Sequence, residues 1–200
     1  MYYWRKLDDK KRAEVLAYRK LQRLPWHAPP HFEYSGEQKF IVSASCFEHR
    51  PIIGQDKSRI TAFESGLIDL CAKLAVVLYA WCVLPNHYHL LIQTADIETF
   101  LKTLGKFHGS TSYIWNGEDD ARGRRVWFRA VERSMRSQRH FLASLNYIHH
   151  NPVKHGYVAK WQDWPFSSAR EYLENVGHEA AEQTWRDYPV LDYGIEWDPA

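Results

Sequence analysis

Residues 81–92 read WCVLPNHYHLLI, and this stretch constrains how the rest of the chain can fold. Apolar and β-branched residues flank Pro85-Asn86, a turn pair, so the sequence predicts two antiparallel strands joined tightly. His87 and His89 stand two apart in the second strand, and side chains alternate between the faces of a strand, so both imidazoles point the same way. Two such imidazoles can hold a metal ion or a phosphate oxygen, although surface or hydrogen-bonded core histidines are commoner.

A second stretch, residues 146–158, reads NYIHHNPVKHGYV. Ser137 is a reasonable N-cap for a helix that we expect to end at or before Asn151, because Pro152 follows. Tyr147 and Asn151 are four apart and therefore share a face over the last turn. A phenol beside an amide oxygen can serve as nucleophile and metal ligand; the alternative is a core aromatic and a C-cap. The apolar residues that predict the helix recur at helical spacing: Phe141, Leu142, Leu145 and Ile148.

Together the two stretches resemble the single-tyrosine HUH transposases, which combine a His-hydrophobe-His strand with a helix carrying a tyrosine and an amide four residues on. Residues 81–89, 147–158 and 163–168 are more closely similar to the REP-associated tyrosine transposases of bacteria. The likeness runs from about Phe40 to Ser168, and several separated motifs in the same order make it specific. Many relatives outside this group carry glutamine in place of Asn151, so the expected ligand is shorter here by one methylene.

The rest of the chain supplies a predicted order of strand, helix, strand, strand, helix, strand and an added helix. That order is the ferredoxin-like split βαβ arrangement of the α+β class, an antiparallel sheet with helices on one face and the added C-terminal catalytic helix across the open face. The resemblance implies the same fold. The expected strands are 39–47, 75–84, 87–94 and 126–131, and the expected helices are 4–24, one ending near 73, one from N-cap Asp96 toward Trp115, and 137–151.

The predicted organisation has three parts. Residues 1–38 form a basic N-terminal helix and a Pro-rich linker, residues 39–172 form the HUH transposase domain, and residues 173–200 form an acidic C-terminal tail. Charge follows this division: residues 122–139 hold seven arginines and one acid, whereas residues 171–198 hold eight acids and one base. Such asymmetry suggests a side that faces a polyanion and a separate acidic segment, although solvated helix faces also carry charge runs.

The composition indicates a globular protein without a membrane span. Hydrophobic residues make up 45% of the 200, and the longest apolar run, 74–84, is far shorter than the roughly 20 residues that a span needs. The first six residues lack the apolar core of a secretory signal. Three cysteines without paired spacing favour reduced thiols. We therefore expect a cytoplasmic protein, and the resemblance implies a bacterial one associated with nucleoid DNA.

The resemblance implies metal-dependent nicking and strand transfer of single-stranded or hairpin DNA from REP-like palindromic repeats, through a 5′-phosphotyrosine intermediate. Tyr147 is the expected nucleophile. His87, His89 and Asn151 would hold one divalent cation, Mg²⁺ or Mn²⁺. No nucleotide cofactor is expected, because the chain has no Gly-x-x-x-x-Gly-Lys loop. The oligomeric state, monomer or homodimer, stays open.

Contacts to DNA are expected from basic and aromatic residues near the catalytic helix. The basic candidates are Arg125, Arg129, Arg133, Arg136, Lys154 and His155. Each arginine has an ordinary surface role as its alternative. Trp127, Phe128, Trp161 and Trp164 could stack on unpaired bases, although core packing is commoner. His149 and His150 are turned about 100° per residue around the helix from Tyr147 and are expected to face elsewhere.

Three other functions compete with this prediction. The first is a non-catalytic DNA-hairpin-binding protein on the same scaffold. The second is a small-molecule metalloenzyme, for example a phosphoesterase, that uses His87 and His89 and never becomes attached to DNA. The third, a rolling-circle replication initiator or relaxase, ranks low because most of those arrange the tyrosine and metal ligands differently.

Overall fold

The computed structural model describes residues 8–21 and 37–190, and the chain divides into two compact units, Met1–Ser35 and Gly36–Ala200. In the first unit, helix α1 (Asp9–Leu21) forms within the range predicted for a basic helix. The Pro-rich linker and the ends of the chain lie outside the described residues. No helix in the described ranges combines the length and apolarity that crossing a bilayer requires.

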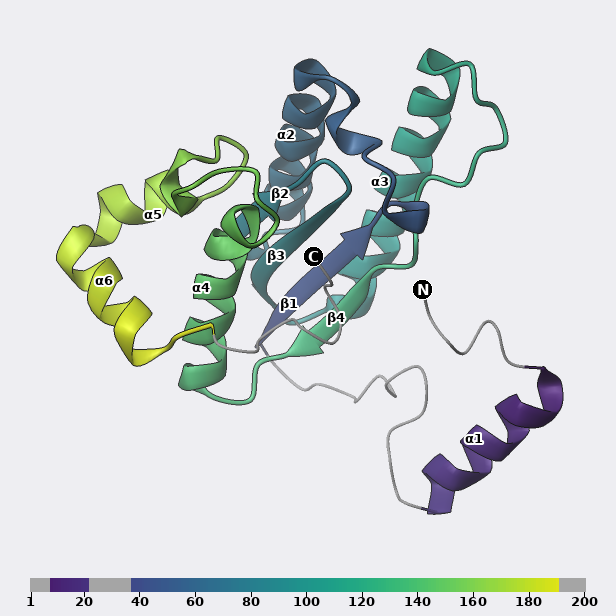
Figure 1. Ribbon diagram of the computed structural model, residues 1–200, viewed down its shortest axis with the longest axis horizontal. Coiled ribbons are helices and arrows are strands. Elements are labelled where there is room, and N and C mark those ends of the chain that lie inside the picture. Colours follow the sequence, from purple (N-terminus) through teal and green to yellow (C-terminus); the bar gives the residue numbers. More distant parts are fainter. Residues whose placement is uncertain (1–7, 22–36, 191–200) are drawn as a thin grey trace. The chain divides into compact units, whose positions relative to one another are not determined.

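The second unit is built on a four-stranded sheet (Figure 1). The strands are β1 (Gln38–Ser45), β2 (Val77–Val83), β3 (His87–Thr94) and β4 (Val131–Ser134). They lie in the order β2-β3-β1-β4, and each neighbouring pair is antiparallel. This is the strand order of the ferredoxin-like split βαβ fold, so the predicted fold class is confirmed. β3 is a central strand, as the site requires.

Opposite faces of the sheet carry different helices. Tyr88 of β3 packs on Phe63 of α2 (Lys57–Lys73), with ring centroids 5.5 Å apart, and bonds to His108 of α3 (Ile97–Glu118). Leu91, three residues further along β3, belongs instead to a buried cluster with α4 (Gln138–Lys154). Because alternate side chains of a strand point to opposite faces, α2 and α3 cover one face and α4 the other. The histidines of β3 share the α4 face with Leu91.

The sequence prediction placed the last strand too early in the chain. The prediction put it at 126–131, but the structure has it at Val131–Ser134, and before it only an isolated bridge joins Trp127 to Cys46. The apolar character that suggested a strand has another cause. Trp127 is buried against His108, whose ring lies parallel to it at 4.2 Å, so this irregular segment is apolar because it covers α3.

The end of α4 also differs from the prediction, because the helix continues through Pro152 to Lys154. A proline here forfeits one backbone hydrogen bond and leaves the following turn intact. Gly156, at φ +71°, then closes the helix: its N–H donates to the carbonyl of Val153 at 3.0 Å, and the N–H of Tyr157 donates to that of Pro152 at 2.9 Å. Asn151 is thus held inside regular helix.

Candidate active site

The turn between β2 and β3 is held by two neighbouring loops. The N–H of Cys46 donates to the carbonyl of Asn86 at 2.7 Å, and the N–H of Gly54 donates to that of Pro85 at 3.0 Å. A Cβ at position 54 would lie 2.5 Å from the Cβ of Pro85, so only glycine allows this approach. The start of β3, and with it His87, is therefore fixed from outside the hairpin.

Asn86 orients the imidazole ring of His87. Its amide Nδ2 donates to the carbonyl of His49 at 3.2 Å, so its Oδ1 faces Nδ1 of His87 at 2.7 Å. An amide oxygen only accepts hydrogen bonds, so this contact suits the tautomer with the proton on Nδ1 of His87, which leaves the lone pair of Nε2 for a ligand. Nε2 itself faces a second amide oxygen, Oδ1 of Asn151. His49 and its neighbour Glu48 both adopt left-handed backbone angles, φ 54° and 57°, a strained conformation next to the site.

His89 is oriented by the sheet itself. Ser43 stands opposite it in the β1–β3 register, and the serine Oγ lies 2.6 Å from Nδ1 of His89. Nε2 of His89 points the other way and lies 3.5 Å from the Oη atom of Tyr147 on α4. The two imidazole rings have centroids 5.2 Å apart.

Helix α4 completes the site from across the sheet face. Oδ1 of Asn151 lies 2.9 Å from Nε2 of His87, and Tyr147 sits one turn earlier beside His89. All four side chains are buried, with 0–4% of their surface exposed. The structure therefore brings together His87, His89, Tyr147 and Asn151 as the sequence analysis expected, while the chemical role of each stays a prediction.

The donor set suits a divalent cation. In the tautomer with Nδ1 of His87 protonated, Nε2 and the Oδ1 atom of Asn151 are both acceptors, and a cation between them would satisfy both. Their 2.9 Å separation matches adjacent ligands of an octahedral ion, which at bond lengths of about 2.1 Å lie about 3 Å apart. Among the described residues there is no group of three or more His, Cys, Asp or Glu side chains suited to a metal. Two neutral imidazoles and an amide carry no charge, so an ion held by this set would keep its charge for an anion.

The histidines that follow Tyr147 face away from the site, as predicted. Nε2 of His149 bonds to Oγ of Ser168 at 2.9 Å, and burial lowers the pKa of His149 to about 3. Burial also lowers the pKa of His150, which lines a separate cavity beside Trp185.

Two predicted DNA contacts do lie at the site. The ring of His155 is 4.8 Å from that of His87, and Nζ of Lys154 lies 5.5 Å from the centre of the Tyr147 ring. Lys154 is the last residue of α4 and His155 is its C-cap, so both are positioned by the turn of helix that follows Pro152.

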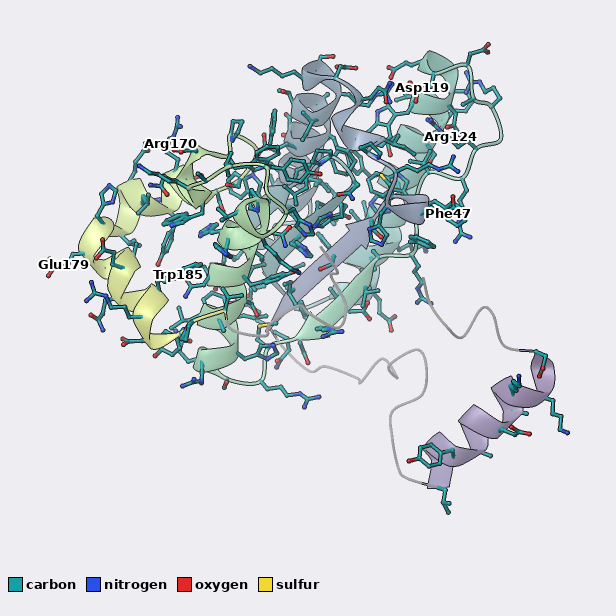
Figure 2. The ribbon with its side chains drawn as sticks, in the orientation of Figure 1. Phe47, Asp119, Arg124, Arg170, Glu179 and Trp185 are labelled. Carbon is teal, nitrogen blue, oxygen red and sulfur yellow. The ribbon has the colours of Figure 1, made fainter. Side chains whose placement is uncertain are left out.

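The four arginines predicted to contact DNA lie elsewhere, in the edge strand β4 and in the segments just before and after it. Arg125 stacks over the rings of Phe47 and Phe128, at 4.7 and 5.5 Å. Arg129 is exposed beside Phe128, Arg133 lies in β4 opposite Ile41, and Arg136 follows the strand. Figure 2 shows the labelled Phe47 and Arg124 on the side of the second unit that lies away from α5 and α6.

The tryptophans predicted to stack on bases have different surroundings in the structure. Trp127 is in the core and Trp164 donates its Nε1–H to the carbonyl of Val83 at 2.9 Å, so both have packing roles. Trp161 lines the cavity beside His150.

Sequence reasoning missed the residues that orient the two histidines. Asn86 was noted only as a turn residue, although its position next to His87 was a usable signal. Ser43 lies 46 residues from His89 in the chain, and only the strand register places it there.

No family model matches the chain, but the chain is similar to curated proteins. A Haemophilus influenzae protein named "Putative REP-associated tyrosine transposase" is 29% identical over 156 residues, covering 70% of this chain and 87% of that protein. The "REP-associated tyrosine transposase" of Escherichia coli K12 is 34% identical over 91 residues, covering 44% of this chain and 52% of that protein.

Among solved structures, a REP-associated tyrosine transposase bound to a REP hairpin has a TM-score of 0.56 and 19% identity, over 72% of this chain and 83% of its own. This likeness shows that the two chains share an α+β fold built on a four-stranded antiparallel sheet. The chain is thus similar to REP-associated tyrosine transposases, which confirms the predicted resemblance.

Proposed function

We propose that this protein is a transposase that nicks and rejoins hairpin-forming single-stranded DNA of REP-like palindromic repeats, with Tyr147 as the nucleophile. The observation that carries the proposal is the convergence of two histidines of β3 with the phenol and amide of α4. Nε2 of His89 lies 3.5 Å from Oη of Tyr147, across 58 residues of sequence. The names of both curated relatives and the REP hairpin bound by the solved neighbour support the same substrate.

The proposed reaction is a transesterification. The phenolic oxygen of Tyr147 forms a bond to the scissile phosphorus as the bond from phosphorus to the 3′ oxygen breaks. The phenol loses its proton and the departing 3′ oxygen takes one up, leaving a 5′-phosphotyrosine and a free 3′ hydroxyl. The reverse attack by a DNA hydroxyl releases Tyr147 and rejoins the strand, so no external energy source is needed.

The chain's own residues prepare this chemistry. His87, His89 and Asn151 would hold one Mg²⁺ or Mn²⁺ ion, which when bound polarises the phosphoryl oxygen and stabilises the departing one. Asn86 and Ser43 keep the imidazoles in the orientation that such an ion needs. The ammonium of Lys154, 5.5 Å from the centre of the Tyr147 ring, can contact a phosphate oxygen of the strand under attack.

The test is incubation of the protein with end-labelled hairpin DNA and MnCl₂, followed by a denaturing gel. We expect a protein-linked strand that EDTA abolishes. Tyr147→Phe should lose this product while binding the hairpin within about twofold of wild type, because only the hydroxyl is removed. Tyr79→Phe, a similar change on β2 beside α4, is the matched control and should cleave normally.

The two outcomes that contradict the proposal are distinct. Cleavage by Tyr147→Phe would mean that another group is the nucleophile. Tight hairpin binding by the wild type with no covalent product in Mg²⁺ or Mn²⁺ would favour the non-catalytic DNA-binding protein instead.

A further inference from the structure

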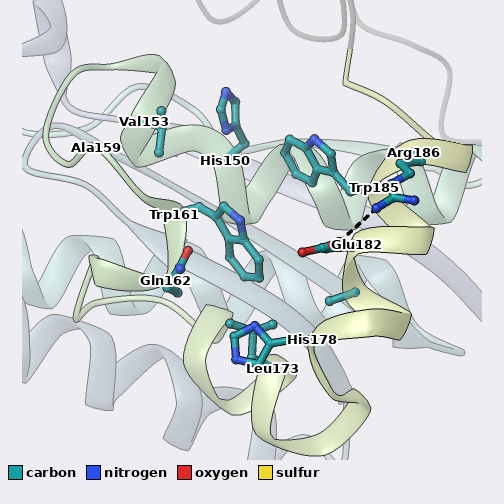
Figure 3. Close-up of a pocket in the computed structure, with 11 residues that line it drawn as sticks. His150, Val153, Ala159, Trp161, Gln162, Leu173, His178, Glu182, Trp185 and Arg186 are labelled. Carbon is teal, nitrogen blue, oxygen red and sulfur yellow. Dashed lines mark hydrogen bonds and ion pairs between the residues drawn. The ribbon is translucent and has the colours of Figure 1, made fainter.

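The structure has a cavity on each side of the sheet. One is lined by α4, η4 (Trp161–Asp163), α5 (Ala169–Val176) and α6 (His178–Asp187) (Figure 3). The other, which we call the α3 cavity, lies between α3 and the segment 127–130 that leads into β4. Its volume is about 480 Å³, within the roughly 300–1,000 Å³ typical of small-molecule sites. Because α3 and α4 cover opposite faces of the sheet, the α3 cavity faces away from Tyr147.

Aromatic rings form the inner wall of the α3 cavity. The ring of His108 is stacked on the indole of Trp127, with centroids 4.2 Å apart and planes within 10° of parallel. Nε2 of His108 lies 2.9 Å from the hydroxyl of the buried Tyr88. The Nε1–H of Trp127 donates to Oγ1 of Thr111 at 3.1 Å. These bonds hold both rings in place, and Phe128 adds a third ring, so the wall suits a flat apolar group.

The side of the cavity that α3 provides is open because residue 105 has no side chain. A Cβ built on Gly105 would meet nothing within 4 Å. Leu101, one turn earlier, and Ala130 complete the apolar lining. A ring can therefore lie against the helix without displacing any side chain there.

The exposed side chains that line the cavity are positively charged. They are Lys102 of α3 and Arg129, and none of the described lining residues is an acid. A phosphate monoester carries close to two negative charges at neutral pH, whereas a carboxylate or a phosphate inside a DNA strand carries about one. Arginine also binds phosphate with two parallel hydrogen bonds. Two cations beside an apolar wall therefore suit a ring compound with a terminal phosphate.

We infer that the α3 cavity binds a free nucleoside monophosphate, with the base against the His108–Trp127 pair and the phosphate at Lys102 and Arg129. The inference is independent of the proposed cleavage. Apart from His108 and the two cations, the lining residues are apolar, so we expect little discrimination between bases. Arg129, which the sequence analysis assigned to DNA, would have this second role.

The test is calorimetric titration of the full chain with dAMP, in EDTA so that no divalent cation is bound. Deoxyadenosine, inorganic phosphate and benzoate are the comparison ligands, since each lacks either the phosphate or the base. We expect each of them to bind at least about tenfold more weakly than dAMP. Lys102→Met should weaken binding of dAMP and leave that of deoxyadenosine unchanged.

A substitution that fills the cavity has a matched control on the same helix. Gly105→Leu places a side chain in the cavity and should abolish binding of dAMP. Gly109 lies one turn further along α3, where a new Cβ also meets nothing within 4 Å, but it does not line the cavity. Gly109→Leu should therefore bind dAMP as wild type does. Both variants should resist urea at least as well as wild type, because leucine favours a helix over glycine.

Four results would overturn the inference. They are no binding of dAMP by wild type, equal affinity in wild type and Gly105→Leu, equal loss in the two leucine variants, and binding of benzoate as tight as that of dAMP. A fifth arm adds excess hairpin DNA to the complex with dAMP. We expect no displacement, and displacement would mean that dAMP occupies the DNA site rather than a separate small-molecule site.

Discussion

Nε2 of His87 and Oδ1 of Asn151 lie 2.9 Å apart although 64 residues separate them in the chain. The pairing joins a sheet strand to the last turn of α4. In the tautomer with the proton on Nδ1, which the contact with Asn86 suits, the two facing atoms both carry lone pairs. The proposed cation would lie between them, and this proposal can be tested by changing only the amide.

Replacing Asn151 by aspartate should strengthen cation binding, and replacing it by leucine should weaken it at least tenfold. Aspartate keeps the oxygen and adds a charge, whereas leucine has a similar shape but no ligand atom. Calorimetric titration with MnCl₂ measures both affinities directly. Hairpin binding in EDTA should be the same for both variants. A leucine variant with wild-type Mn²⁺ affinity would show that Asn151 is not a ligand.

Removing the side chain of Asn86 should lower cation affinity about 10- to 100-fold, although Asn86 need not touch the ion. The loss follows because His87 then has no acceptor for its Nδ1–H and the ring can rotate or change tautomer. The midpoint of the Mn²⁺ dependence of cleavage is the measurement. Ser58→Ala, an exposed serine change, is the control. An unchanged midpoint in Asn86→Ala would contradict the orienting role.

Gly54→Ala should displace the hairpin turn, because the new Cβ would lie 2.5 Å from that of Pro85. We expect a loss of about 1–3 kcal/mol in the free energy of unfolding and weaker cation binding. Gly105→Ala is the matched control: a Cβ there meets nothing within 4 Å, so this helix position should gain about 0.5–1 kcal/mol. Urea denaturation compares the two. Equal effects would mean that Gly54 has no special role.

We expect the buried His108 to make the folded protein less stable in acid. Burial lowers the pKa of this histidine to about 4, below the value of about 6.5 expected in the unfolded chain. The unfolded state therefore binds the proton more readily. The contribution of neutral His108 to the free energy of unfolding is fully present above about pH 6.5 and is lost as the pH falls toward 4. The corresponding stability is about 3 kcal/mol.

The measurement is the urea midpoint as a function of pH. His108→Gln keeps an acceptor for the hydroxyl of Tyr88, 2.9 Å away in the wild type, but cannot titrate. It should therefore lose less stability between pH 7 and pH 4.5 than wild type. His178→Gln, the same change at an exposed histidine, is the matched control. A slope unaltered by His108→Gln would refute this account.

Local sequence patterns were sufficient to predict most of the helices and strands. Asp96 and Ser137 were expected to be N-caps, and their side chains accept the N–H groups of Thr99 and His140 at 2.8 and 3.1 Å. A cap depends on residues three positions apart, so the sequence alone contains the information. The wrong placement of β4 has the opposite cause, because burial of Trp127 under α3 looks the same in sequence as a strand.

The alternation of His87 and His89, and the four-residue spacing of Tyr147 and Asn151, came from the sequence by itself. Both are properties of one strand or one helix, in which geometry follows from residue spacing. Only the tertiary structure decided that these pairs meet, that Ser43 and Asn86 orient the imidazoles, and that Trp185 closes a cavity beside α4. Those contacts join segments up to 64 residues apart, and their partners depend on strand register and helix packing, which neighbouring residues do not specify.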